Sequence, residues 1–251
     1  MKIVVVVSAV VAVVVSFLGS GAWIGTPIAE AAGGALSATS TLVAPAGPAF
    51  SIWSVIYTGL VAYAVWQFLP GRTARHDALR APIVASMLLN PAWIVAIQIG
   101  QVWLSVIVIV ALLAVLVRVF VLMQQHRPEG VADAVITDGT MGIYLGWVCV
   151  ATIANISAWL VSLGFTGGAT VWAVIVLAVA AGVGVLLARY SSGALAPMLA
   201  IVWGLGWLAQ GRFSGDVVDT TVGWAAVLAA VVVAVTTVGT RVRVGKRVSV
   251  G

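Results

Sequence analysis

Residues 102–123 read VWLSVIVIVALLAVLVRVFVLM, and Arg118 is the one charged side chain among them. A helix rises 1.5 Å per residue, so about 20 apolar residues cross the ~30 Å hydrocarbon core of a bilayer. Lipid offers no hydrogen-bond partner to an exposed strand edge, whereas a helix satisfies its own backbone. The stretch therefore predicts a transmembrane helix, with Arg118 close enough to one end to reach the membrane surface.

Seven further stretches have the same apolar character and are separated by Gly, Pro or charged residues. The sequence therefore predicts an all-α integral membrane protein with about eight transmembrane helices. We place these helices at residues 3–24, 49–69, 82–99, 102–123, 139–163, 170–188, 194–210 and 221–240.

The overall composition agrees with a lipid environment. Hydrophobic residues make up 63% of the chain and charged residues 8%, whereas soluble domains carry about 25% charged residues. The net charge of +5 does not indicate a nucleic-acid partner, because the basic residues lie at the ends of apolar stretches and not in one patch. The expected partner is the lipid bilayer.

The basic residues also predict the orientation. With eight spans, only Arg212 falls on one side of the membrane, and eleven basic residues fall on the other. Because positive residues favour the cytoplasmic side, we expect a multi-pass protein of the cell membrane with its N- and C-termini in the cytoplasm. The eleven are Lys2, Arg72, Arg75, Arg80, Arg118, Arg127, Arg189, Arg241, Arg243, Lys246 and Arg247.

Two N-terminal features have alternative interpretations. Lys2, the valine-rich stretch and the sequence Ala29-Glu30-Ala31 resemble a secretory signal with a cleavage site, but the apolar stretch is long for a signal, so we favour a retained helix. Residues 25–47 form the longest connection, on the outer side, and are either a linker or a lid over the bundle.

The chain lacks the residue groups that most membrane catalysts need. By the boundaries above, no Lys, Asp, Glu or His lies in the middle of a span, which argues against ion-coupled transport and intramembrane proteolysis. Asp138 begins the fifth span, and His76 and His126 are expected in solvated cytoplasmic loops. Cys149 is the single cysteine and is expected to be a buried hydrophobic residue. We therefore predict no metal site and no enzymatic activity.

Three stretches carry more information than their hydropathy. Each places its aromatic or polar side chains three or four residues apart, which aligns them on one helix face. The first holds Phe50, Trp53 and Tyr57 after Pro45-Ala-Gly-Pro48; the second holds Asn90 and Trp93; the third holds Tyr144, Trp147, Ala151, Thr152 and Asn155. Gly142 and Gly146 form a GxxxG pattern that permits close helix approach.

Together these stretches resemble the tryptophan-rich sensory protein family, also called the translocator protein family (TspO/MBR). The motifs occur in the order and in the helices where the family has them. Ile143 replaces a family proline, and Pro91 lies within the second motif. The family is a five-helix bundle, so the resemblance covers residues 1–163. Residues 164–240 would be three additional helices, and residues 241–251 a basic cytoplasmic tail.

The resemblance implies a function and a site. Family members bind porphyrins, sterols and related flat apolar molecules between these helices, often as homodimers. It implies a binder, sensor or carrier of a small apolar ligand such as a tetrapyrrole (porphyrin or haem), with no cofactor required and a homodimer as a possible state. Facilitated transport of a neutral solute, light-dependent porphyrin degradation and a structural role in assembly are the alternatives. The expected binding residues are Phe50, Trp53, Tyr57, Asn90, Trp93, Tyr144, Trp147, Ala151 and Asn155.

Overall fold

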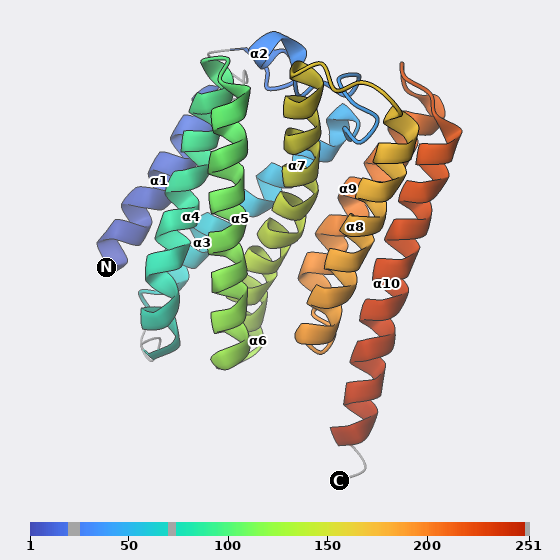
Figure 1. The fold of residues 1–251 in the computed structure, drawn as a ribbon. Helices are drawn as coiled ribbons and strands as arrows, with labels where there is room; N and C mark the ends of the chain where they lie inside the picture. Colours follow the sequence, from blue (N-terminus) through green and yellow to red (C-terminus); the bar gives the residue numbers. More distant parts are fainter. Residues whose placement is uncertain (20–25, 70–73, 249–251) are drawn as a thin grey trace.

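A computed structural model describes residues 1–19, 26–69 and 74–248 and shows a bundle of long helices (Figure 1). The predicted end of the first helix at residue 24, and Arg72 between the second and third, lie outside these residues. Eight helices of the described chain are 15 residues or longer, and they correspond in order to the eight predicted spans. They are α1 (Lys2–Gly19), α3 (Ile52–Trp66), α4 (Ala74–Gln98), α5 (Val102–Gln125), α7 (Thr140–Ser162), α8 (Ala169–Tyr190), α9 (Leu195–Ser214) and α10 (Thr220–Val248).

The predicted fold class, an all-α integral membrane protein, is confirmed. Six helical segments of the described chain are long and apolar enough to cross a membrane. One of them joins the short 3₁₀ helix η1 (Gly47–Ser51) to α3, and another joins α6 (Val131–Asp133) and the π-helical turn η2 (Ala134–Gly139) to α7. The two remaining long helices are α1, which is shorter and apolar, and α9.

Three helical segments extend beyond the predicted spans at one end of the bundle. Among the described residues, α4 begins at Ala74 and not at 82, the helical segment that includes α7 begins at Val131 and not at 139, and α10 continues to Val248 through the residues assigned to a basic tail. A prediction from hydropathy ends each span at the first charged residues. At the starts of α4 and of the segment that includes α7, however, the charged residues pair with one another inside the protein.

The paired charges gather around Asp133, whose side chain is fully buried. Arg75 forms ion pairs with Asp133 and Asp138, and its Nε donates a 2.7 Å hydrogen bond to the His126 carbonyl oxygen. The prediction that His76 lies in a solvated loop was wrong: it is in α4, buried, with Nε2 3.4 Å from Asp133. These charged side chains therefore hold the ends of neighbouring helices together inside the protein.

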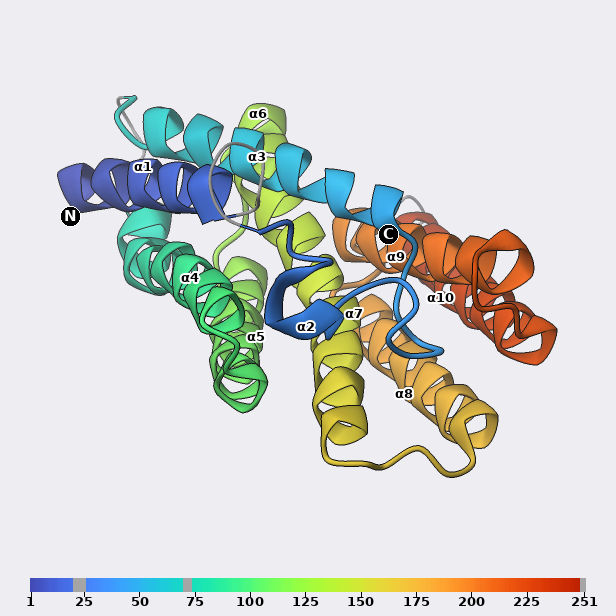
Figure 2. The same cartoon turned by 90° about the horizontal axis from the view of Figure 1, so that it is seen from above.

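The helices form two groups with separate cores. Residues of α1, α3, α4, α5 and α7 build the larger core, and residues of α8, α9 and α10 build most of the smaller one. Figure 2 shows α7 between the two groups. The GxxxG glycines lie at this junction: a Cβ on Gly142 would come within 2.7 Å of Ala196 Cβ, and one on Gly146 within 2.3 Å of the Pro197 carbonyl oxygen, both in α9. The absence of side chains here allows α7 and α9 to touch.

The connection between α1 and η1, residues 26–46, is called the connector below. It contains the short helix α2 (Ala31–Gly34) and lies over the bundle at the end away from both termini (Figures 1 and 2). Helix α9 holds the connector and η1 by three hydrogen bonds: Arg212 Nη2 to the Ala38 oxygen (2.6 Å), the Ala46 amide to the Trp207 oxygen (3.3 Å), and Trp203 Nε1 to the Ala49 oxygen (2.9 Å).

Asp219 joins two helices at the same end of the bundle. It caps α10 by accepting a 3.0 Å hydrogen bond from the Val222 amide, and it accepts a 2.7 Å bond from the Thr170 hydroxyl at the start of α8. These bonds, the Val222 amide first, lower the pKa of Asp219 below its usual value. Its charge therefore stabilises the fold above the unfolded-state pKa of about 3.9.

We expect Asp219→Ala to cost about 1 kcal/mol of stability at neutral pH, the usual cost of losing such a cap. The difference from wild type should shrink as the pH falls below about 4, where the carboxyl becomes protonated. The measurement is thermal unfolding in detergent followed by tryptophan fluorescence, which reports unfolding at both neutral and acid pH, because the chain contains 11 tryptophans. If wild type and Asp219→Ala differed in stability by the same amount at pH 7 and at pH 3, the Asp219 charge would not stabilise the fold.

Candidate ligand-binding site

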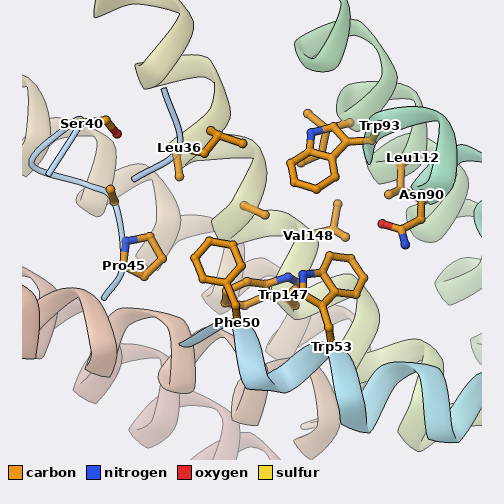
Figure 3. A pocket seen from close by; sticks show the side chains of 14 residues that line it. Leu36, Ser40, Pro45, Phe50, Trp53, Asn90, Trp93, Leu112, Trp147 and Val148 are labelled. Atoms are coloured by element: carbon orange, nitrogen blue, oxygen red, sulfur yellow. The ribbon is translucent and has the colours of Figure 1, made fainter. Parts of the chain in front are cut away.

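An apolar cavity, the inner cavity, lies beneath the connector between α3, α4, α5 and α7. Figure 3 shows that its side chains converge from helices far apart in the sequence. Its walls are Leu36, Ser40, Ala44, Pro45, Phe50, Trp53, Asn90, Trp93, Ile109, Leu112, Trp147, Val148, Ala151 and Ala154. Because connector residues form part of the wall, the lid interpretation of this segment fits the structure better than a linker.

Aromatic rings form one side of the inner cavity. The Trp53 and Tyr57 rings, one helical turn apart on α3, are stacked with their centroids 5.5 Å apart. The Trp147 ring meets both Trp53 and Phe50 edge to face, at 6.3 Å and 5.6 Å. The three- and four-residue spacing that the sequence showed in α3 is thus what brings these rings to one face.

Two polar atoms of the cavity lining have no partner among the described residues. Asn90 donates from Nδ2 to the Tyr57 hydroxyl (2.8 Å) and to Ser16 Oγ (3.3 Å), while its Oδ1 is buried and accepts no hydrogen bond. The indole Nε1 of Trp147 is also buried and unpartnered. One acceptor and one donor are therefore left in apolar surroundings, where an unmade hydrogen bond is costly.

A second polar group fixes the ring of Trp93. Trp93 Nε1 donates a 2.7 Å hydrogen bond to Asn155 Oδ1, and Asn155 Nδ2 donates to Ser105 Oγ at 2.9 Å. Asn155 thus links α4, α5 and α7 behind the cavity wall. Asn155 therefore makes interhelical hydrogen bonds, which is the ordinary role of asparagine in a membrane helix.

A larger pocket, the α1–α3 pocket, adjoins the inner cavity. Its volume is about 490 Å³, whereas the inner cavity measures about 30 Å³, close to the share of one water molecule in liquid water. Phe50, Trp53 and Trp93 line both. These three side chains therefore form the wall that the inner cavity and the α1–α3 pocket share.

The structure brings seven of the nine expected binding residues to these two spaces. Phe50, Trp53, Asn90, Trp93, Trp147 and Ala151 line the inner cavity, and Tyr57 lines the α1–α3 pocket. Tyr144 and Asn155 line neither: Tyr144 is fully buried and its hydroxyl donates to the Ser86 carbonyl oxygen at 3.2 Å. Sequence reasoning missed the cavity residues Leu36, Ser40, Ala44, Ile109, Leu112, Val148 and Ala154, which no motif marks.

Metal ligands do not gather in the described part of the chain, where no three His, Cys, Asp or Glu side chains lie close enough to hold an ion. The two spaces therefore offer aromatic faces, aliphatic walls and a few neutral polar atoms. This is the usual chemistry of a site for a small apolar molecule with a polar edge.

Comparison with known proteins gives one match. The family model for TSPO-like proteins matches residues 2–239. The match includes α8, α9 and most of α10, beyond the residues 1–163 that carried the resemblance in sequence. No curated protein and no solved structure matches the chain. Since the family match spans nearly every described helix, the chain belongs to the TSPO-like protein family.

Proposed function

We propose that this protein is a membrane-embedded binder and sensor, or carrier, of a flat apolar ligand with a polar edge, such as a tetrapyrrole. The observation that carries the proposal is the pair of buried, unpartnered atoms, Asn90 Oδ1 and Trp147 Nε1, in two residues that line one apolar cavity. A ligand edge with both a donor and an acceptor would satisfy the two, and aromatic walls suit a flat ring.

The volumes suggest how the ligand would sit. The inner cavity is too small for a tetrapyrrole, but the α1–α3 pocket, at about 490 Å³, falls within the usual range for small-molecule sites. We propose that the ring lies in this pocket and that the shared side chains Phe50, Trp53 and Trp93 rotate to admit its polar edge. With the termini in the cytoplasm, both spaces would face the outer half of the membrane.

The test is a titration of purified protein with protoporphyrin IX, followed by tryptophan quenching. Asn90→Leu keeps the approximate size of the side chain and removes the amide, whereas Trp147→Phe keeps an aromatic ring, although a smaller one, and removes the indole N–H. Each should raise Kd about five- to tenfold, the usual worth of one buried hydrogen bond. Trp224→Phe is the matched control, because Trp224 is 66% exposed on α10, outside both spaces.

The variants are compared by the midpoints of their titrations and not by the extent of quenching, because removing a tryptophan changes the fluorescence amplitude. Quenching that does not saturate, or midpoints for Asn90→Leu and Trp147→Phe equal to that of the control, would refute the proposal. Movement of the bound ligand across proteoliposomes would identify a carrier. Loss of porphyrin absorbance under light that depends on Trp53 would identify an enzyme and replace the binding proposal.

A further inference from the structure

A third pocket, the α7–α8 pocket, lies outside the site described above. Helices α7 and α8 diverge toward the connector end, where residues 163–168 join them (Figures 1 and 2). The space between them, closed by connector residues 39–43, has a volume of about 420 Å³. Among the described residues, Ser40 alone lines both this pocket and the inner cavity, so the two are separate sites on either side of the connector.

The joining loop explains why α7 and α8 stand apart. Gly164 and Gly168 have φ values of +85° and +66°, a conformation that glycine adopts without strain. The rings of Phe165 and Trp172 meet edge to face, 5.6 Å apart, and both line the pocket, so the loop is held open in a defined shape.

The lining of the pocket is neutral and combines apolar side chains with hydroxyl groups. Leu160 and Val176 line the part between the helices, where Ser157 adds one hydroxyl, and the connector contributes three hydroxyl groups beside Leu42 and Val43. The Thr41 hydroxyl is buried and has no hydrogen-bond partner among the described residues. None of the described lining residues is charged.

We propose that the α7–α8 pocket binds a neutral, single-chain lipid of the monoacylglycerol type. Its hydroxyl or ester group would pair with the Thr41 hydroxyl at the connector, where the protein surface meets the interface, and its acyl chain would lie between α7 and α8. An anionic or phosphate head group would find no cation in the lining, and burying such a charge unpaired is costly. The pocket does not depend on the tetrapyrrole site.

The experiment uses the full-length protein in nanodiscs of phosphatidylcholine and a monoacylglycerol with a photoreactive diazirine in its chain. Cross-linked peptides are mapped by mass spectrometry. We expect saturable labelling of residues 157–176 that an excess of unlabelled monoacylglycerol removes. Thr41→Val, which keeps the shape and removes the hydroxyl, should weaken this labelling about five- to tenfold.

Ala169→Trp should reduce the labelling, because Ala169 is exposed and lines the pocket, so that the larger side chain would occupy part of it without disturbing the core. Thr58→Val is the control, since Thr58 is an exposed hydroxyl on α3. Dye reactivity of Cys149 verifies that each variant is folded. Labelling spread evenly over the lipid-facing helices, wild-type labelling of Ala169→Trp, or equal competition by an anionic fatty acid would each overturn the proposal.

Discussion

Replacing Asp133 with alanine is expected to destabilise the protein by up to about 3–5 kcal/mol, the usual cost of breaking a buried ion pair by removing one partner. The Asp133 carboxylate has no exposed surface and contacts three other elements of the structure. Besides the ion pair with Arg75, it accepts hydrogen bonds from Trp66 Nε1 (3.2 Å) and the Thr137 hydroxyl (2.8 Å). Its removal leaves Arg75, itself buried, with Asp138 as its remaining carboxylate partner.

The measurement is thermal unfolding followed by the reaction of Cys149 with a thiol-reactive dye. Asp77→Ala is the matched control: Asp77 also pairs with an arginine, Arg80, but its side chain is 64% exposed. Ion pairs that water can reach contribute about 0–1 kcal/mol, and Arg80 keeps its hydrogen bond to Gln67 Oε1, so this control should unfold close to the wild-type temperature. Equal shifts for the two variants would show that the Asp133 cluster does not support the packing of α3, α4 and α7.

The second large effect is expected at the junction of the two helix groups. Gly146→Ala places a methyl group 2.3 Å from the Pro197 carbonyl oxygen and 2.9 Å from Ala200 Cβ. The oxygen belongs to the backbone of α9 and cannot rotate away, so the two helices must separate. Overpacking of this kind costs about 1–3 kcal/mol, although alanine is otherwise the better helix former.

Gly206→Ala is the control for this substitution, and it should not lower the stability of the protein. Gly206 is in α9, exposed, and a Cβ there would meet nothing within 4 Å. The change should be neutral or stabilising, by up to about 1 kcal/mol. Because α9 also holds the connector through Arg212, Trp203 and Trp207, Gly146→Ala should additionally weaken ligand binding, which Gly206→Ala should leave unchanged. A stabilised Gly146→Ala variant would contradict the close contact.

Much of the site could be predicted, because its residues lie in a few helices. Trp53 and Tyr57 share a face of α3, and Asn90 and Trp93 lie close together in α4, so periodicity identified them. Tyr144 and Asn155 share the helix with Trp147, but the structure places them against neighbouring helices and not in a pocket. Spacing assigns residues to a face, whereas the rotation of the helix decides which part of that face meets empty space.

Connector residues such as Leu36 and Ser40 could not be predicted as part of the cavity. They lie in a segment without periodicity, and α9, more than 150 residues further along the chain, holds that segment in place. The hydrogen bond between Arg212 and the Ala38 carbonyl oxygen has no counterpart in any local pattern. Arg212 was predicted on the outer side as an isolated basic residue, and the structure shows it buried.

The membrane environment, the helix number and the family resemblance could all be inferred from the amino-acid sequence, because hydropathy over some 20 residues is a local property that lipid makes decisive. Tertiary structure alone decided which charges are buried and which side chains surround a pocket. His76 and Asp133 lie on different helices, and burial of either depends on the other's position. The α7–α8 pocket exists because the connector, α7 and α8 meet at one place, and only the folded chain brings them together.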